Sequence, residues 1–145
     1  MLYFDTSILV PLFIPESSSD KVRQLMDRQR EGTLATSHWT RAEFSSMLAR
    51  EVRMGKYKDF FASKVDAKFE SAIRSGFTMY IPGLPEFETA KQFVLRYDSG
   101  LRVGDALHLA IARNNNAQAI YSLDDRMIRA GKLLGLPVSR GIRGR

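Results

Sequence analysis

Two aspartates of the sequence each stand at the end of a short apolar run that is typical of a buried strand. Asp5 follows residues 2–4, and Asp124 follows residues 118–123. In open α/β sheets, ligands bind in the crevice outside the carboxyl ends of the strands, so both carboxylates are candidates for chemistry. The structural alternative for Asp5 is that it caps the helix expected to begin near Ser7, as aspartate often does.

Two further acids, Glu43 and Asp105, each fall in the first turn of a predicted helix. Taken singly, these acids also have structural explanations. Thr40 with Glu43 matches a capping box, and so does Ser122 with Asp125. A negative charge at Asp105 would suit the macrodipole of its helix.

Taken together, the four acids form a pattern that capping does not predict. In a parallel sheet, strand exits and the first turns of helices can converge on one rim, which would bring Asp5, Glu43, Asp105 and Asp124 together. Four carboxylates without cysteine or a histidine-rich set suit a hard, oxygen-seeking cation such as Mg²⁺ or Mn²⁺. Without a cation, such a cluster would repel itself and raise the pKa of at least one member.

The apolar patterns predict the elements that would position these acids. Strands are expected at 2–4, 33–37, 77–81, 118–123 and 137–139, and helices at 7–13, 17–31, 40–54, 57–75, 86–97, 103–113 and 125–134. The strands are separated by one or two helices, and no tight hairpin joins them. This favours the α/β class, with a mostly parallel sheet of about four or five strands flanked by about seven helices. One domain is expected over 1–139, followed by a basic tail at 140–145.

Two helices carry apolar faces that indicate packing. On the helix expected at 57–75, the face consists of Phe61, Val65, Phe69, Ala72 and Ile73. The helix expected at 103–113 is nearly all apolar inside, and His108 lies one turn after Asp105 on it. We therefore interpret His108 as a buried, hydrogen-bonded histidine rather than as a metal ligand.

Composition restricts the class of protein. With 145 residues, of which 44% are hydrophobic, the chain can bury one sizeable core. Its 22 Lys and Arg against 16 Asp and Glu give a net charge of +6, which suggests a polyanionic partner such as nucleic acid. The absence of cysteine fits a reducing cytoplasm. No signal peptide or membrane span is visible, so we expect a soluble cytoplasmic protein without a membrane partner.

Four short motifs, taken in order, resemble those of the PIN-domain nucleases, and more closely those of the VapC toxins of bacterial toxin–antitoxin pairs. The motifs are Asp5, Thr6 and Ser7 with the apolar run 8–10, then the segments 41–44, 104–110 and 121–126. The family usually has Thr where this chain has Ser122. The resemblance covers essentially the whole chain, and four motifs in the correct order are fairly specific.

The resemblance implies site residues and a reaction. Asp5, Glu43, Asp105 and Asp124 would hold one or two divalent ions, Mg²⁺ or Mn²⁺. The hydroxyls of Ser7 and Ser122 would support them. Asp124 is preferred to Asp125 because it keeps the spacing from the hydroxyl. Water activated by the metal would attack a phosphodiester of RNA in line, which makes the chain an endoribonuclease.

The resemblance also implies partners for the chain. These are an RNA substrate, a cognate antitoxin protein and a second copy of the chain in a homodimer. Arg41 and Arg102 each lie within three residues of a site acid and are candidates for phosphate contacts.

Two alternatives stay open. The acids could be structural in a non-catalytic module that binds RNA or an antitoxin. The chain could instead transfer phosphoryl groups through an aspartyl phosphate, although phosphatases of that kind place a second acid two residues after the nucleophile, where this chain has Ser7.

Overall fold

The computed structural model describes residues 1–144, and Arg145, the last residue of the expected tail, lies outside the described residues. Within this range one sheet is formed, in the order β3-β2-β1-β4-β5, and every adjacent pair is parallel. Its strands are β1 (Leu2–Phe4), β2 (Leu34–Ser37), β3 (Thr78–Tyr80), β4 (Ala119–Tyr121) and β5 (Val138–Ser139). The predicted α/β class with a parallel sheet is confirmed.

Seven α-helices connect and cover these strands in the described part of the chain. They are α1 (Thr6–Leu9), α2 (Ser19–Asp27), α3 (His38–Arg53), α4 (Asp59–Gly76), α5 (Leu84–Leu95), α6 (Val103–Asn114) and α7 (Asp125–Leu133). Two 3₁₀ turns, η1 (Val10–Leu12) and η2 (Tyr97–Ser99), complete the set. The single helix expected at 7–13 is divided into α1 and η1 at Pro11, because proline donates no backbone hydrogen bond and its ring clashes with the preceding turn.

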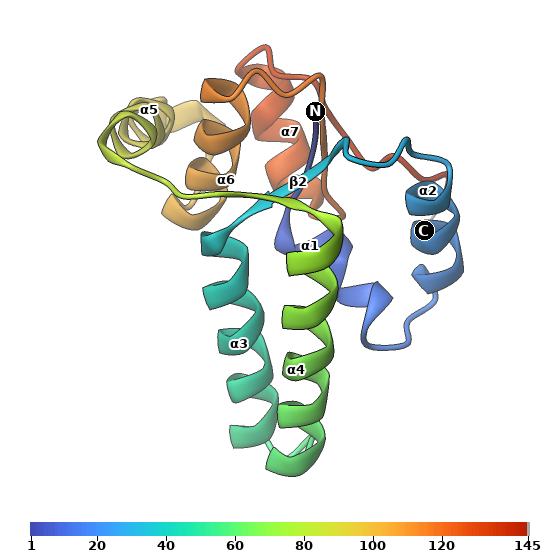
Figure 1. Cartoon of the computed structure of the whole chain (residues 1–145). Helices are drawn as coiled ribbons and strands as arrows, with labels where there is room; N and C mark the ends of the chain where they lie inside the picture. The colour runs from blue at the N-terminus through green and yellow to red at the C-terminus, as the bar shows by residue number, and fades with distance from the viewer. Residues whose placement is uncertain (145) are drawn as a thin grey trace.

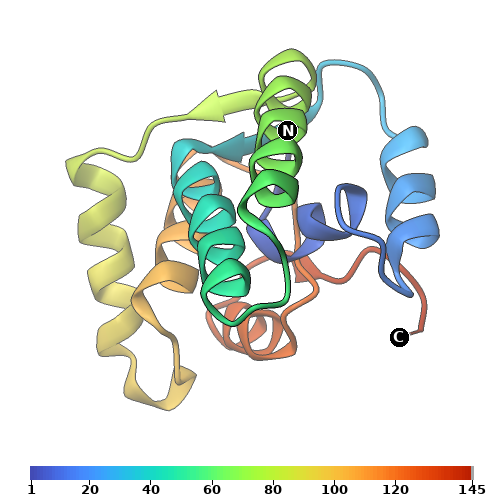
Figure 2. The ribbon, with the colours of Figure 1, turned by 90° about the horizontal axis from the view of Figure 1, so that it is seen from below.

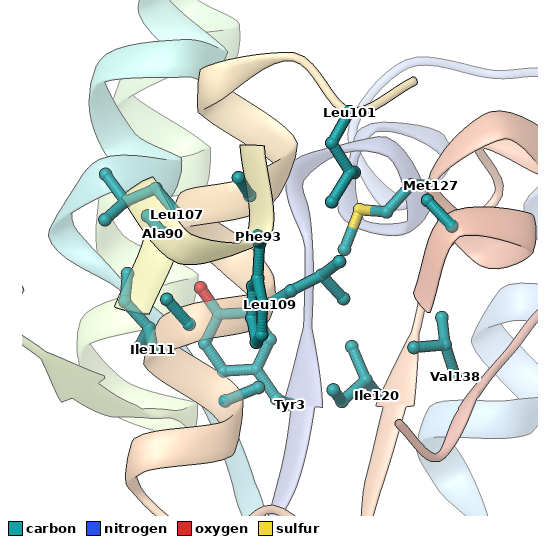
Figure 3. Close-up of a cluster of buried hydrophobic side chains, with 14 of the residues drawn as sticks. Tyr3, Ala90, Phe93, Leu101, Leu107, Leu109, Ile111, Ile120, Met127 and Val138 are labelled. Carbon is teal, nitrogen blue, oxygen red and sulfur yellow. The ribbon is translucent and has the colours of Figure 1, made fainter. Parts of the chain in front are cut away.

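Helices lie on both faces of the sheet, because successive side chains of β1 point in opposite directions. Tyr3 enters a core formed by α5, α6, α7, β4 and β5, whereas Phe4 enters a second core formed by α1 to α4. Figure 3 shows the first core, in which Tyr3 and Ile120 of the sheet meet Leu109 of α6. Figures 1 and 2 show α5 at one side of the molecule and α2 at the other.

The long helices α3 and α4 run side by side, as both views show. The rings of Phe44 and Phe69 stack between them with centroids 3.8 Å apart. The face of α4 that packs is Ala62, Val65, Phe69 and Ile73, all of them buried. Phe61 and Ala72, which were expected on this face, are exposed, because the buried stripe passes through Ala62 at the start of the helix.

The described part of the expected tail lies along α2. The Lys21 ammonium donates a hydrogen bond to the carbonyl of Arg143 at 2.9 Å, and Ile142 packs against the second core. Within residues 1–144, no helix has both the length and the apolar character needed to cross a bilayer.

Candidate functional site

Asp5 is placed by the end of β1 and is almost fully buried, with 3% of its surface exposed. Its Oδ1 accepts hydrogen bonds from the Ser7 hydroxyl at 2.8 Å and from the backbone N–H of Ile8 at 3.2 Å. Its Oδ2 accepts from the Ser122 hydroxyl at 2.6 Å. Asp5 is therefore the N-cap of α1, as the structural interpretation predicted. Burial raises its pKa, although His108 and these hydrogen bonds oppose the rise.

Glu43 belongs to α3 and is bound by groups from two other elements. Its Oε1 accepts a hydrogen bond from the Thr6 hydroxyl at 2.6 Å, and Nε2 of His108 on α6 donates to the same oxygen. The predicted capping box of Thr40 and Glu43 is wrong, because α3 begins two residues earlier, at His38. The Thr40 hydroxyl instead lies 2.7 Å from that of Thr36 on β2.

His108 is buried and hydrogen-bonded, as its apolar helix predicted. Its Nδ1 lies 2.9 Å from the Tyr3 hydroxyl, which donates in turn to Ser37 at 3.0 Å. Burial alone would lower the pKa of His108, but the hydrogen bond and charge of Glu43, with the charges of Asp5 and Asp105, raise it. Burial would raise the pKa of Glu43, and His108 and Thr6 outweigh it and hold that pKa below its usual value. Each partner therefore favours the charged form of the other.

Asp105 stands in the first turn of α6, where its predicted place is confirmed. Within residues 1–144 no hydrogen bond or ion pair reaches its carboxylate. Its pKa is raised to about 6, first by partial burial and then by the charge of Asp124, with smaller contributions from Asp5 and Glu43, while His108 acts in the opposite direction. These effects on the pKa require that the other acids lie near Asp105.

Asp124 is the N-cap of α7. Its Oδ1 accepts from the backbone N–H groups of Arg126 at 2.9 Å and Met127 at 3.3 Å, and its own N–H donates to the Ser122 hydroxyl at 3.0 Å. The predicted capping box of Ser122 and Asp125 is wrong, because the cap is Asp124 and the Ser122 hydroxyl is bound to Asp5. Asp125 is exposed and accepts from Arg140 at 2.8 Å.

One pocket of about 470 Å³ is lined by all four acids. Its walls are Asp5, Thr6, Ser7, Val10, Glu43, Met47, Arg50, Asp105, His108 and Asp124. Asp5 and Asp124 come from the exits of β1 and β4, and Asp105 comes from the first turn of α6. Glu43 was expected in the first turn of its helix but lies in the second turn of α3, because that helix begins at His38. The fold collects all four acids near the carboxyl ends of two adjacent strands. In their present orientations, no three acidic or histidine side chains among residues 1–144 are arranged so that they could hold an ion.

The two arginines predicted to contact phosphate are placed differently. Arg41 points to α4, where its Nε donates to both carboxylate oxygens of Glu70 at 2.9 and 3.0 Å, and it does not line the pocket. Arg102 precedes α6 and lines a neighbouring cavity together with Asp105 and Asp124. Arg50, which the sequence analysis missed, lines the pocket itself. Its position two helical turns after Glu43 was the available signal.

Comparison with known proteins identifies related sequences and structures. A family model described as the PIN domain matches residues 2–133. No curated protein sequence matches the chain.

Three solved structures have similar folds. The VapC20 toxin of Mycobacterium tuberculosis, described as cleaving the sarcin-ricin loop, is 19% identical with a TM-score of 0.68, over 90% of this chain and 95% of that chain. The VapBC-1 structure from nontypeable Haemophilus influenzae is 13% identical with a TM-score of 0.70, over 97% and 98%. The VapBC2 structure from Rickettsia felis, bound to a DNA fragment from its promoter, is 17% identical with a TM-score of 0.67, over 96% and 98%. At these identities the likeness shows the fold.

Proposed function

The chain belongs to the PIN domain family, and from this premise we propose that it is a metal-dependent endoribonuclease and the toxin of a toxin–antitoxin pair. The observation that carries the proposal is the single pocket lined by Asp5, Glu43, Asp105 and Asp124. These residues are remote along the chain and belong to separate elements. Capping explains the local hydrogen bonds of Asp5 and Asp124, but it gives no reason for Glu43 and Asp105 to face the same space.

The side chains that line the pocket suit Mg²⁺ or Mn²⁺ in the type of their donor atoms and in facing one common space. Carboxylate and hydroxyl oxygens are the ligands that these hard cations prefer, and the pocket offers no thiolate, because the chain has no cysteine. Partial burial, and after it the charges of Asp124, Asp5 and Glu43, raise the pKa of Asp105, and a cation beside its carboxylate would offset both effects. Because the present orientations form no ion site, binding would require side chains to turn, and Asp105 is not held by a hydrogen bond within residues 1–144.

The chain's own residues would hold and orient the site. The Ser7 and Ser122 hydroxyls fix both oxygens of Asp5, and Thr6 with His108 fixes one oxygen of Glu43. Such outer contacts orient the ligands of a metal site. A bound divalent ion would supply a more acidic water and would stabilise the charge that develops on the leaving oxygen. Asp5, Glu43, Asp105 and Asp124 would hold it.

RNA is the proposed substrate. The net charge of +6 favours a polyanion, and one structural relative is described as a toxin that cleaves the sarcin-ricin loop. We infer cleavage in single-stranded or looped segments, because sequence-specific RNA recognition mostly uses unpaired bases.

A cognate antitoxin and a second copy of the chain are the proposed protein partners, and the cytoplasm is the proposed compartment. Structural relatives were crystallised as toxin–antitoxin complexes. Co-expression with the product of the neighbouring gene should give a stable complex in which cleavage is inhibited. A chain that elutes as a monomer and does not bind that product would contradict both partner assignments.

A second candidate is a non-catalytic module that binds RNA or an antitoxin. The observation in its favour is that no three side chains of the described residues are arranged to hold an ion. Phosphoryl transfer through Asp5 is less favoured, because both of its oxygens already accept hydrogen bonds from serine hydroxyls.

The distinguishing experiment is cleavage of total cellular RNA with Mg²⁺, with Mn²⁺ and with a chelator. We expect defined cuts with either metal, no cuts with the chelator, and at least a hundredfold slower cleavage by Asp5→Asn and Asp105→Asn. Asp27→Asn, which removes an exposed acid outside the pocket, is the matched control. Equal cleavage by all four proteins would defeat the site, and no cleavage by any of them would favour the non-catalytic module.

A further inference from the structure

A row of basic side chains on α7 begins directly beside the acidic pocket. Arg126 lies two residues after the N-cap Asp124, and Arg129 and Lys132 follow it at intervals of three residues; all three are exposed. Residues three apart on a helix lie on the same side, with Cβ atoms about 5–6 Å apart. We call these three residues the basic face of α7.

Two cavities connect this face to the pocket. The first, of about 400 Å³, is lined by Arg126 and Arg129 together with Asp105 and Asp124, which also line the acidic pocket. The second, of about 860 Å³, lies between α7 and η2 and is again lined by Arg126 and Arg129, with Lys132 at its far part along the helix. The two arginines therefore form the wall between both cavities, and a continuous hollow surface leads away from the acids.

The charges of the basic face are not neutralised by the rest of the fold. Elsewhere arginines pair with acids, as Arg41 does with Glu70 and Arg96 with Asp98. Within residues 1–144, none of the three residues of the basic face takes part in an ion pair. Asp98, an acid that lines the second cavity, is already paired with Arg96 at 3.0 Å. The face is therefore available to an anionic ligand.

A single RNA strand fits this arrangement better than an isolated anion does. A phosphodiester that enters a pocket with four carboxylates is repelled by them, and basic groups beside the pocket would offset the repulsion on the neighbouring phosphates. Long, flexible arginine and lysine side chains at regular intervals can each reach a different phosphate, and arginine matches phosphate oxygens with its planar fork.

We propose that the basic face of α7 binds successive phosphates of the RNA strand on one side of the scissile bond. This inference rests on the proposed ribonuclease function and adds the course of the substrate along the protein. Arg126 and Arg129 hold the phosphates nearest the pocket, and Lys132 holds the next one along η2.

The test measures binding separately from cleavage. A fluorescently labelled single-stranded RNA of about twelve nucleotides is titrated with full-length protein in the Asp105→Asn background, over a series of salt concentrations. The variants are Arg126→Gln with Arg129→Gln, and, as the matched control, Arg28→Gln with Arg30→Gln at the end of α2, which line neither cavity. Both pairs remove the same charge. Circular dichroism verifies that each variant is folded.

Loss of two phosphate contacts should reduce the slope of log affinity against log salt by about 1.4, and should weaken binding on the order of 25-fold at 0.1 M salt. The α2 control should change both values by much less. Equal losses of RNA affinity in the α7 variant and the α2 control would overturn the inference, because they would show that binding depends only on net charge. Unchanged binding by the α7 variant would also overturn it, as would equal competition by a polyglutamate chain of the same charge.

Cleavage by the wild-type protein is scored independently of these titrations. Absence of cleavage with normal α7-dependent RNA binding would count against the proposed function and would leave the binding surface supported. Cleavage whose KM is the same in the α7 variant and in the wild type would count against the binding surface alone.

Discussion

At the scale of single residues, the carboxylate of Asp105 is the least satisfied group of the pocket. It has no hydrogen-bond donor within residues 1–144, and its pKa of about 6 lies above the unfolded value of 3.8. The folded state therefore binds this proton more tightly than the unfolded state does. Its contribution to stability is fully present below about pH 4 and is lost as the pH rises through about 6.

Asp105→Asn should therefore stabilise the metal-free protein at pH 7.5. Because the carboxylate is only partly buried, we expect a gain of about 1 kcal/mol, or about 3 °C in melting temperature. The gain should shrink as the pH falls and disappear by about pH 3, where Asp105 is protonated in both states. Thermal melts in chelator over this pH range measure it. A variant that is less stable than the wild type at pH 7.5 would show that the carboxylate is not under repulsion.

The Tyr3 hydroxyl contacts both Ser37 and His108, and His108 in turn contacts Glu43 of the site. Tyr3→Phe should destabilise the protein by about 1–3 kcal/mol, because the buried partners of the hydroxyl lose a hydrogen bond. Tyr121→Phe is the matched control, since its hydroxyl makes no hydrogen bond within residues 1–144. Urea unfolding compares the two. Equal effects would mean that the contact with His108 does not stabilise the fold.

Part of the candidate site could be predicted from the sequence. Asp5 and Asp124 were predictable because both follow apolar runs that end at strand exits, and His108 was predictable as a buried residue from its apolar helix. The contacts of Glu43 with Thr6 and His108 were not predictable. They join residues that are far apart in the chain, and no local spacing encodes a tertiary hydrogen bond.

At the scale of elements, α7 joins the site to the sheet. Its N-cap is the site acid Asp124, and the helix packs on β5 at the edge of the sheet. Its Gly131 packs so closely on β5 that an added Cβ would clash with Cγ2 of Val138. Gly131→Ala should therefore cost about 1–3 kcal/mol by overpacking. Gly76→Ala at the end of α4 is the control, because an added Cβ there meets nothing within 4 Å. A Gly131 variant as stable as the control would refute this packing.

The helices and strands were predicted more reliably than their ends. The spacing of apolar residues locates a helix or strand, because these residues must face a core. Glycine and proline show roughly where the element stops, because they interrupt the pattern. The start of α3 at His38 could not be derived in this way. The helix follows the N-cap Ser37, and Thr40, the expected capping residue, lies inside it with its hydroxyl against that of Thr36 on β2.

At the scale of the whole molecule, the pocket depends on both cores. Glu43 is carried by α3, whose Phe44 and Leu48 belong to the core on one face of the sheet, and Asp105 is carried by α6, which is buried in the core on the other face. Parallel topology brings both helices to the same rim (Figure 1). The acids therefore lie near one another only when both layers are packed on the sheet.

The most direct measurement is the anomalous diffraction of manganese in crystals grown with Mn²⁺. We expect a peak in the acidic pocket, with oxygens of Asp5, Asp105 and Asp124 or Glu43 at about 2.0–2.2 Å, close to the distances typical of Mg²⁺. The same crystals of Glu43→Gln and Asp105→Asn should show a weaker peak or none. A fully occupied peak outside the pocket, or an empty pocket at millimolar Mn²⁺, would contradict the claim that these four carboxylates share a divalent ion.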